Sequence, residues 1–220
     1  MKTPPTLSPS CVTMRRLKRS STRAFTLIEL MVVMSIMLLL MTLSVGVAHS
    51  WKAQKLTTEA RLLSGQLSEV ALLAQKDNFP VQVRFYLLPN EFGDTSSEAM
   101  RAVQLARLTG FDPNTRQPIY KFLSEVRFFE DDIILLNLKN YTSLCEKEPT
   151  PAGESDPEIK GEKRSYRSFH FLPNGSTDLP RTPDAVFTLV KENEMKSGNQ
   201  PPPNYRSVML QPVTGKATMY

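Results

Sequence analysis

Residues 30–51 have the sequence LMVVMSIMLLLMTLSVGVAHSW, a stretch without Asp, Glu, Lys or Arg. Its length decides what it can do, because a 22-residue helix rising 1.5 Å per residue spans ~33 Å, enough for the hydrocarbon core of a bilayer. A buried helix of a globular protein is the alternative interpretation, but such helices are rarely apolar on every face. The stretch therefore predicts a membrane-spanning helix.

The helix is expected to continue beyond this stretch, because no proline occurs between Pro9 and Pro80. Apolar residues then follow at alternating spacings of three and four, which places them on one helix face: Ala53, Leu56, Ala60, Leu63, Leu67, Val70 and Ala74. Charged residues fall off this stripe at Lys52, Lys55, Glu59 and Glu69. We expect one helix from about Phe25 to about Gln75, with lipid-facing and amphipathic halves.

After Pro80 the pattern changes to short β-rich runs. The strand candidates are residues 81–88, 102–108, 119–129, 132–138, 167–172, 185–191 and 206–213, of which the second and third also fit short helices. Polar segments at 90–100, 145–165 and 193–204 are expected to be solvated loops. Pro173-Asn174-Gly175 is typical of a turn. The predicted fold class is α+β, with the long helix packed on a small antiparallel sheet.

The net charge of +5 comes from one end of the chain. Residues 1–24 contain six positive residues and no acidic residue: Lys2, Arg15, Arg16, Lys18, Arg19 and Arg23. The remaining chain is close to neutral, so no nucleic-acid partner is predicted. Positive charge before a membrane helix instead predicts a cytoplasmic N-terminus and an exported C-terminal part.

The chain has few residues of the types that form disulfides, bind metals or act in catalysis. Cys11 and Cys145 are the two cysteines, and His49 and His170 are the two histidines. A disulfide framework and a metal site are therefore not expected. We also expect no enzymatic activity and no cofactor, because no set of nucleophile, base and orienting group can be argued around His170.

Glu29 is out of place in an apolar helix, because an acidic side chain at the bilayer centre costs about 2.5–3.5 kcal/mol and less toward the interface. A cleaved signal peptide and a plain signal anchor are two interpretations of this N-terminus. The third comes from residues 24–33, AFTLIELMVV. This segment resembles the cleavage and methylation motif of type IV prepilins and pseudopilins.

The resemblance implies roles for three residues. A prepilin peptidase would cut between Ala24 and Phe25, Phe25 would become the methylated N-terminus, and Glu29 would pair with the amine of a neighbouring subunit. Ala24 stands where this family usually has Gly, and the 24-residue leader is long. A start at Met14 would shorten that leader to eleven residues.

The C-terminal part resembles minor pseudopilins of the GspH/FimT kind. Residues 168–175, SFHFLPNG, and 206–216, RSVMLQPVTGK, carry this likeness. The whole layout is also similar to the pilin-like Verru_Chthon cassette protein D.

The expected organisation has four parts: a cleaved basic leader (1–24), a transmembrane and assembly helix (25–51), its amphipathic continuation (52–76) and an exported β-rich domain (77–220). The expected function is that of a structural subunit of a type IV pilus-like or type II secretion pseudopilus filament, and the long irregular loops favour a minor subunit. The alternative is a membrane-anchored extracytoplasmic module that binds a secreted substrate or surface ligand. The expected partners are prepilin peptidase, other pilin or pseudopilin subunits and the lipid of the bacterial inner membrane.

Overall fold

The computed structural model describes residues 25–90, 98–130, 132–154, 156–195 and 200–220. Helix α1 runs from Leu27 to Asp77, so the long helix expected over about Phe25–Gln75 is confirmed. It ends where Asn78 takes a left-handed φ of 54° and Pro80 follows. The expected leader, residues 1–24, and its two candidate start sites lie outside the described residues.

The chain divides into two compact units, Met1–Gly46 and Val47–Tyr220. In the first unit, the described large apolar side chains of α1 from Leu27 to Met41 are exposed. Within the described residues, no helix is both long enough and apolar enough to cross a membrane. The membrane span expected at residues 30–51 is therefore not confirmed.

The second unit contains a sheet whose strand pairs are all antiparallel, so the α+β class is confirmed. The strands are β1 (Val81–Leu88), β2 (Ala99–Phe111), β3 (Pro118–Phe122), β4 (Arg127–Phe128), β5 (Ile133–Leu135), β8 (Tyr166–Phe171), β9 (Ala185–Lys191), β10 (Arg206–Leu210) and β11 (Ala217–Met219). Their order is β11-β10-β9-β5-β2-β1-β8, with β3 and β4 paired to β2. A separate hairpin joins β6 (Glu158–Ile159) to β7 (Glu162–Lys163), and two short 3-10 helices are η2 (Ser143–Glu146) and η3 (Glu192–Glu194).

Several boundaries differ from the sequence expectation. The run 119–129 is divided into β3 and β4, and the 90–100 loop ends early because β2 begins at Ala99. The segment 145–165 is not a simple solvated loop, since it contains the β6–β7 hairpin. Short hairpin strands such as β6 and β7 carry too few residues for period-two alternation to be visible in the sequence.

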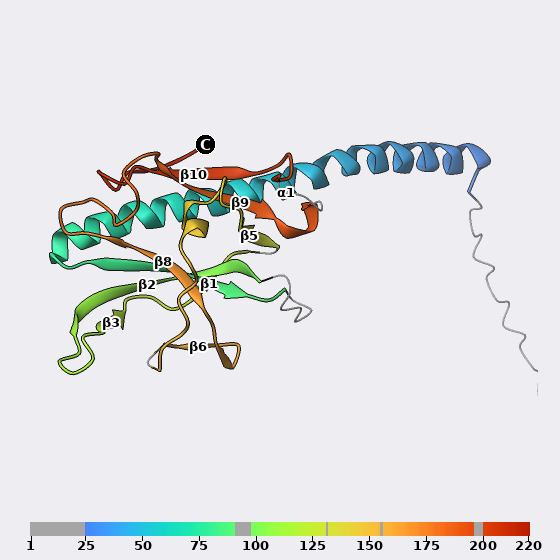
Figure 1. Ribbon diagram of the computed structural model, residues 1–220. Coiled ribbons are helices and arrows are strands. Elements are labelled where there is room, and N and C mark those ends of the chain that lie inside the picture. The colour runs from blue at the N-terminus through green and yellow to red at the C-terminus, as the bar shows by residue number, and fades with distance from the viewer. Residues whose placement is uncertain (1–24, 91–97, 131, 155, 196–199) are drawn as a thin grey trace, which may run out of the picture. The chain divides into compact units, whose positions relative to one another are not determined.

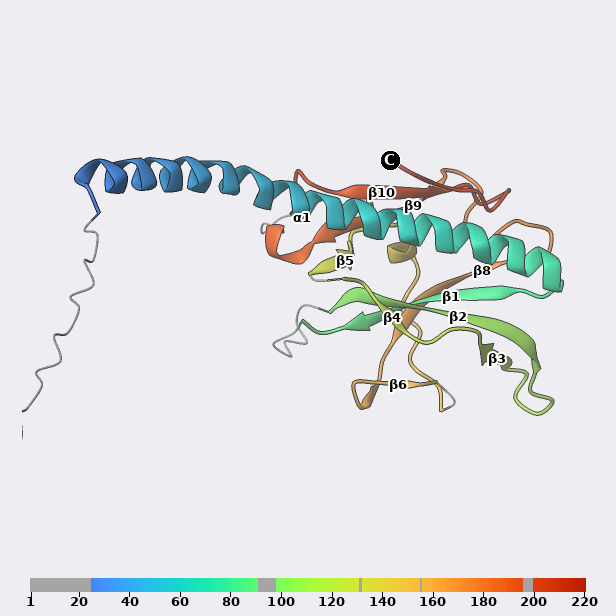
Figure 2. The same ribbon diagram turned by 180° about the vertical axis from the view of Figure 1, so that it is seen from behind.

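The sheet bends around the second half of α1. In both views β10 and β1 lie on opposite sides of this part of the helix (Figures 1 and 2). The backbone N–H of Thr177, just after β8, donates to the carbonyl of Pro212, just after β10, at 2.7 Å. This bond joins segments that follow strands near opposite ends of the sheet.

The predicted stripe of α1 forms the inner core. Buried side chains on the described part of this stripe are Leu56, Ala60, Leu63, Leu67, Val70 and Ala74. Phe85, Phe169 and Phe187 stack against one another on the facing strands, with ring centroids 5.5–6.0 Å apart. Burial of this apolar surface is the main stabilisation available to the second unit.

Glu59 lies off the apolar stripe of α1 and is nevertheless buried. Its residue is 1% exposed, and its Oε2 lies 2.8 Å from Nη1 of Arg127. Arg127 also donates from Nη2 to the Gln66 side chain at 3.3 Å. A buried carboxylate needs such a partner, so Arg127 ties the short strand β4 to the helix.

Strand β1 is covered on both faces, because every residue from Val81 to Leu88 is buried. Its odd-numbered residues belong to the inner core with α1. On the outer face, Tyr86 and Leu88 pack with Ile159 of β6 and Tyr166 of β8. The 145–165 segment therefore forms a layer over the face of the sheet that is turned away from the helix.

Two glycines permit the close approach of turns at the end of α1. Gly175 has φ 85°, and a Cβ there would lie 2.5 Å from the Gln75 side chain. Gly215 has φ 66°, and a Cβ there would lie 2.5 Å from the Gly175 carbonyl oxygen. The predicted turn at residues 173–175 is confirmed, since the Gly175 N–H donates to the Leu172 carbonyl at 2.9 Å.

Gly215→Ala is expected to lower the free energy of unfolding by about 2 kcal/mol, because it adds left-handed strain and a backbone clash. Gly65→Ala is the matched control, since a Cβ on that exposed helical glycine meets nothing within 4 Å. The control should raise the free energy of unfolding by about 0.5–1 kcal/mol. Urea unfolding of the full chain in detergent measures both, and equal effects would contradict the packing described.

Cys145 is a buried free thiol in η2, and burial raises its pKa from 9.0 to about 11. Above about pH 9 the thiol ionises in the unfolded chain but stays protonated in the folded one. The contribution of Cys145 to the free energy of unfolding therefore falls as pH rises above about 9. In a Cys11→Ser chain at pH 8.5, iodoacetamide should modify Cys145 about 100-fold more slowly in the folded state than in urea. Mass spectrometry follows the reaction, and equal rates would refute this placement of the thiol.

Candidate functional site

The N-terminal residues singled out by the sequence lie at the start of α1. Phe25 and Thr26 precede the first helical residue, Leu27, and Phe25 is 82% exposed. Ala24, the other side of the expected cut, lies outside the described residues. The structure therefore leaves the cleavage position as a prediction.

Glu29 has a partner within its own chain. Its Oε2 accepts hydrogen bonds from the backbone N–H and the hydroxyl of Thr26, both at 3.0 Å. In return, the backbone N–H of Glu29 donates to the Thr26 hydroxyl at 3.3 Å. This reciprocal pattern is a capping box, which satisfies N–H groups that a helix start leaves unpaired.

The capping box also places the Glu29 carboxylate at the positive end of the helix dipole, where an anion is stabilised. Sequence reasoning had assigned Glu29 a partner in another subunit and had given Thr26 no role. The signal was present nonetheless, because Thr26 and Glu29 have the Ser/Thr-x-x-Glu spacing of a capping box.

A second candidate site lies on the outer face of the sheet, in a hollow of about 490 Å³. We call it the outer-face hollow. Its lining residues come from β1, the β2–β3 arm, the 145–165 segment and β8: Arg84, Gln117, Pro118, Tyr120, Phe122, Thr150, Pro151, Ala152, Gly153, Asp156 and Tyr166. Its size falls within the range of small-molecule sites.

Arg84 lies at the base of this hollow with a side chain only 2% exposed. Its Nη1 donates to Asp156 Oδ1 at 2.5 Å and its Nε donates to Gln82 Oε1 at 2.6 Å. Burial lowers the pKa of the guanidinium, but the hydrogen bond and charge of Asp156, together with Tyr166 and Tyr86, more than offset this, so the pKa is raised overall. Arg84 therefore stays charged and neutralises Asp156.

Aromatic rings surround the guanidinium. Its central carbon lies 4.3 Å from the ring centroid of Tyr166, 5.0 Å from that of Tyr120 and 5.2 Å from that of Phe122. These separations are within the range of cation–π attraction. Together with the ion pair, they hold the covering 145–165 segment and the β3 strand against β1.

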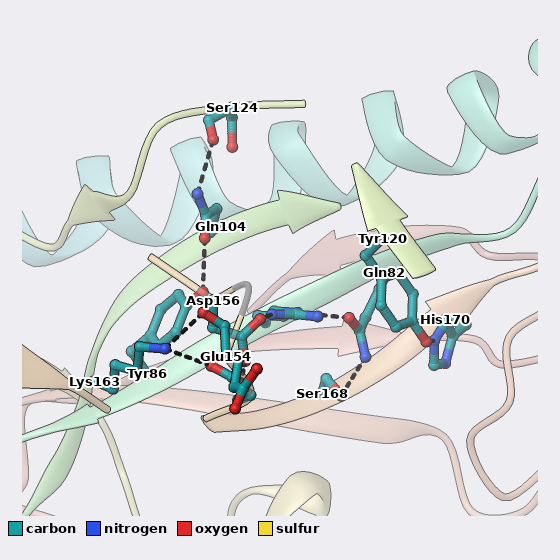
Figure 3. A network of polar contacts seen from close by, with 12 residues as sticks. Gln82, Tyr86, Gln104, Tyr120, Ser124, Glu154, Asp156, Lys163, Ser168 and His170 are labelled. Carbon is teal, nitrogen blue, oxygen red and sulfur yellow. Dashed lines mark hydrogen bonds and ion pairs between the residues drawn. The ribbon is translucent and has the colours of Figure 1, made fainter. Parts of the chain in front are cut away.

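A hydrogen-bonded chain continues from the rim of the hollow. The Tyr120 hydroxyl lies 2.8 Å from His170 Nε2 (Figure 3). On the other side of the ring, His170 Nδ1 lies 2.9 Å from Asp178 Oδ2. Burial raises the pKa of Asp178. The hydrogen bonds from His170 and the charges of Lys147 and His170 together have the larger effect, so the pKa of Asp178 is lowered overall. With Nδ1 protonated, the imidazole donates to Asp178 and accepts from Tyr120.

Sequence reasoning found neither the Arg84 pairs nor the partners of His170. Gln82 also donates to the Ser168 hydroxyl at 2.9 Å (Figure 3). In the sequence, the alternation of Gln82 and Arg84 with apolar residues is typical of a solvated sheet face. Asp156 lies 72 positions from Arg84, so no local spacing could have indicated the pair.

Within the described ranges, no group of three His, Cys, Asp or Glu side chains is placed to hold a metal ion.

Comparison with known proteins gives one match. Residues 19–45 match the model of a prokaryotic N-terminal methylation motif. No curated protein and no solved structure matches the chain. The matched segment contains Phe25, Thr26 and Glu29 and ends within α1. The match supports the resemblance to the type IV pilin-like family and implies processing by a prepilin peptidase.

Proposed function

We propose that this chain is the precursor of a pilin-like structural subunit, a minor component of a type IV pilus-like or type II secretion pseudopilus filament. The observation that carries the proposal is the methylation motif at residues 19–45. In this account prepilin peptidase cuts between Ala24 and Phe25, and the new amine of Phe25 is methylated. Other pilin or pseudopilin subunits are the assembly partners.

Before assembly, the precursor is held by residues 25–51 as a single-pass protein of the bacterial inner membrane. The absence of Asp, Glu, Lys and Arg from residues 30–51 and the six positive charges of the leader support this topology. The N-terminus is then cytoplasmic, and the β-rich part lies outside the cytoplasm. The buried stripe of α1 gives this part an apolar core of its own.

The capping box suggests how Glu29 reaches its assembly partner. In a single chain, Thr26 supplies both hydrogen bonds to the Glu29 carboxylate. In the filament, the methylated amine of a neighbouring subunit would add the positive charge that the carboxylate lacks. Because an unpaired ion in an apolar surrounding is costly, this pair would favour one stagger between subunits.

A second role, as a membrane-anchored extracytoplasmic binding module, is supported by the outer-face hollow. The hollow lies on the sheet face turned away from the helix, so an occupant would not displace the inner core. A minor filament subunit could carry both roles.

Cleavage is tested by intact-mass analysis of the full chain with and without a prepilin peptidase. The expected product begins at methylated Phe25 and contains residues 25–220. Ala24→Gly should be cleaved faster, since Gly is the usual residue at this position in the family that the motif resembles. An unchanged mass with active peptidase would contradict the proposal and leave a plain signal anchor.

The role of the carboxylate is tested with Glu29→Val. The variant should insert into the membrane and be cleaved, but should not be incorporated into filaments, because the pairing charge is gone. Glu69→Val is a matched control, since Glu69 is an exposed acid on the second half of the same helix. Membrane fractionation and filament purification separate the two steps, and normal assembly of Glu29→Val would overturn the role.

A further inference from the structure

Two hollows of comparable size lie over the sheet, and they differ in how their polar groups are already paired within the chain. In the hollow of about 410 Å³ next to Arg101, the guanidinium is already hydrogen-bonded within the chain. There Arg101 donates from both terminal nitrogens to Glu192 at 2.6 Å and from Nε to the Leu88 carbonyl at 3.0 Å. Each of the three Arg101 nitrogens therefore already donates to a partner within the chain, and its charge is paired with Glu192.

In the outer-face hollow, Tyr166 is only 6% exposed. Its ring packs edge-on against Tyr86, with centroids 5.7 Å apart. Its hydroxyl makes no hydrogen bond to any residue in the described part of the chain, whereas the hydroxyl of neighbouring Tyr86 donates to Gln104 at 2.6 Å. No other side chain in the described part of the chain holds the Tyr166 hydroxyl, so a ligand in the hollow can pair with it.

The Tyr166 hydroxyl keeps its proton at neutral pH, because burial raises its pKa above 10.0. It can therefore both donate and accept a hydrogen bond. Next to it, the guanidinium of Arg84 and the carboxylate of Asp156 offer donors and acceptors side by side. The aromatic rings and Pro118 and Pro151 give the walls apolar surface.

We propose that the outer-face hollow binds one residue of a neutral sugar. Sugar hydroxyls both donate and accept, as do the groups at the base of the hollow, and a pyranose ring presents C–H groups to aromatic walls. An ionic ligand is disfavoured because Arg84 and Asp156 neutralise each other. A wholly apolar ligand is disfavoured because it would leave the Tyr166 hydroxyl unpaired.

Binding is measured by saturation-transfer NMR and isothermal titration on the full chain in a detergent that contains no sugar. The probes are the methyl glycosides of glucose, galactose, mannose and N-acetylglucosamine. At least one probe should bind saturably, with transfer strongest at the ring protons that face the aromatic walls. Absence of saturable binding for all four probes up to 20 mM would overturn the proposal.

Two variants locate the site. Tyr166→Phe keeps the ring that contacts Arg84 and removes only the hydroxyl, and it should weaken sugar binding about 10-fold. Ala152→Trp places a large side chain on the half-buried wall of the hollow and should abolish binding. Thermal unfolding of each variant confirms that the fold is retained.

Tyr205→Phe is the matched control, because Tyr205 is exposed and does not line the hollow. It removes a tyrosine hydroxyl elsewhere on the protein, so it should leave sugar affinity unchanged. Unchanged affinity in Tyr166→Phe and Ala152→Trp would show that the sugar binds elsewhere and would refute the proposed site. Peptidase cleavage and filament incorporation do not depend on this outcome.

Discussion

Packing of one apolar face of α1 against the inside of a bent sheet is the constraint on which the second unit depends. Small residues, Ala60 and Ala74, let strands approach the helix, while Leu63 and Leu67 fill the space between. The sheet bends far enough for the segments after β8 and β10 to share a hydrogen bond. Any change that moves α1 would therefore disturb strands on both sides of it.

The inner face of the sheet packs on the helix and is apolar, whereas the outer face is not in contact with the helix. On that outer face, the even-numbered positions of β1 place Gln82, Arg84 and Tyr86 in buried polar and aromatic contacts. Hydrophobic side chains of similar volume would stabilise such a position at least as well as an ion pair. The presence of the Arg84–Asp156 pair there is consistent with a role other than stability.

The sequence predicted the elements whose residues show regular spacing. The extent of α1, its buried stripe and strands β1 and β9 follow from periodicity alone. The outer layer was not predictable, because Asp156 and Ile159 reach β1 through tertiary contacts with no local pattern. The partners of Glu59 and His170, which are Arg127 and Asp178, were not predictable for the same reason, because they are set by the fold. Thr26 was missed although its spacing to Glu29 carries a local signal.

The central claim is that the Glu29 carboxylate pairs with the N-terminal amine of a neighbouring subunit in the filament. Carbodiimide coupling of filaments tests it most directly, with copies of this chain labelled with nitrogen-15 among unlabelled subunits. An apolar carbodiimide reaches the site and joins a carboxylate to an amine only in direct contact. The account predicts labelled Glu29 peptides joined to unlabelled N-terminal peptides. Labelled Glu29 peptides that remain unjoined, or that are joined only within their own chain, would contradict it.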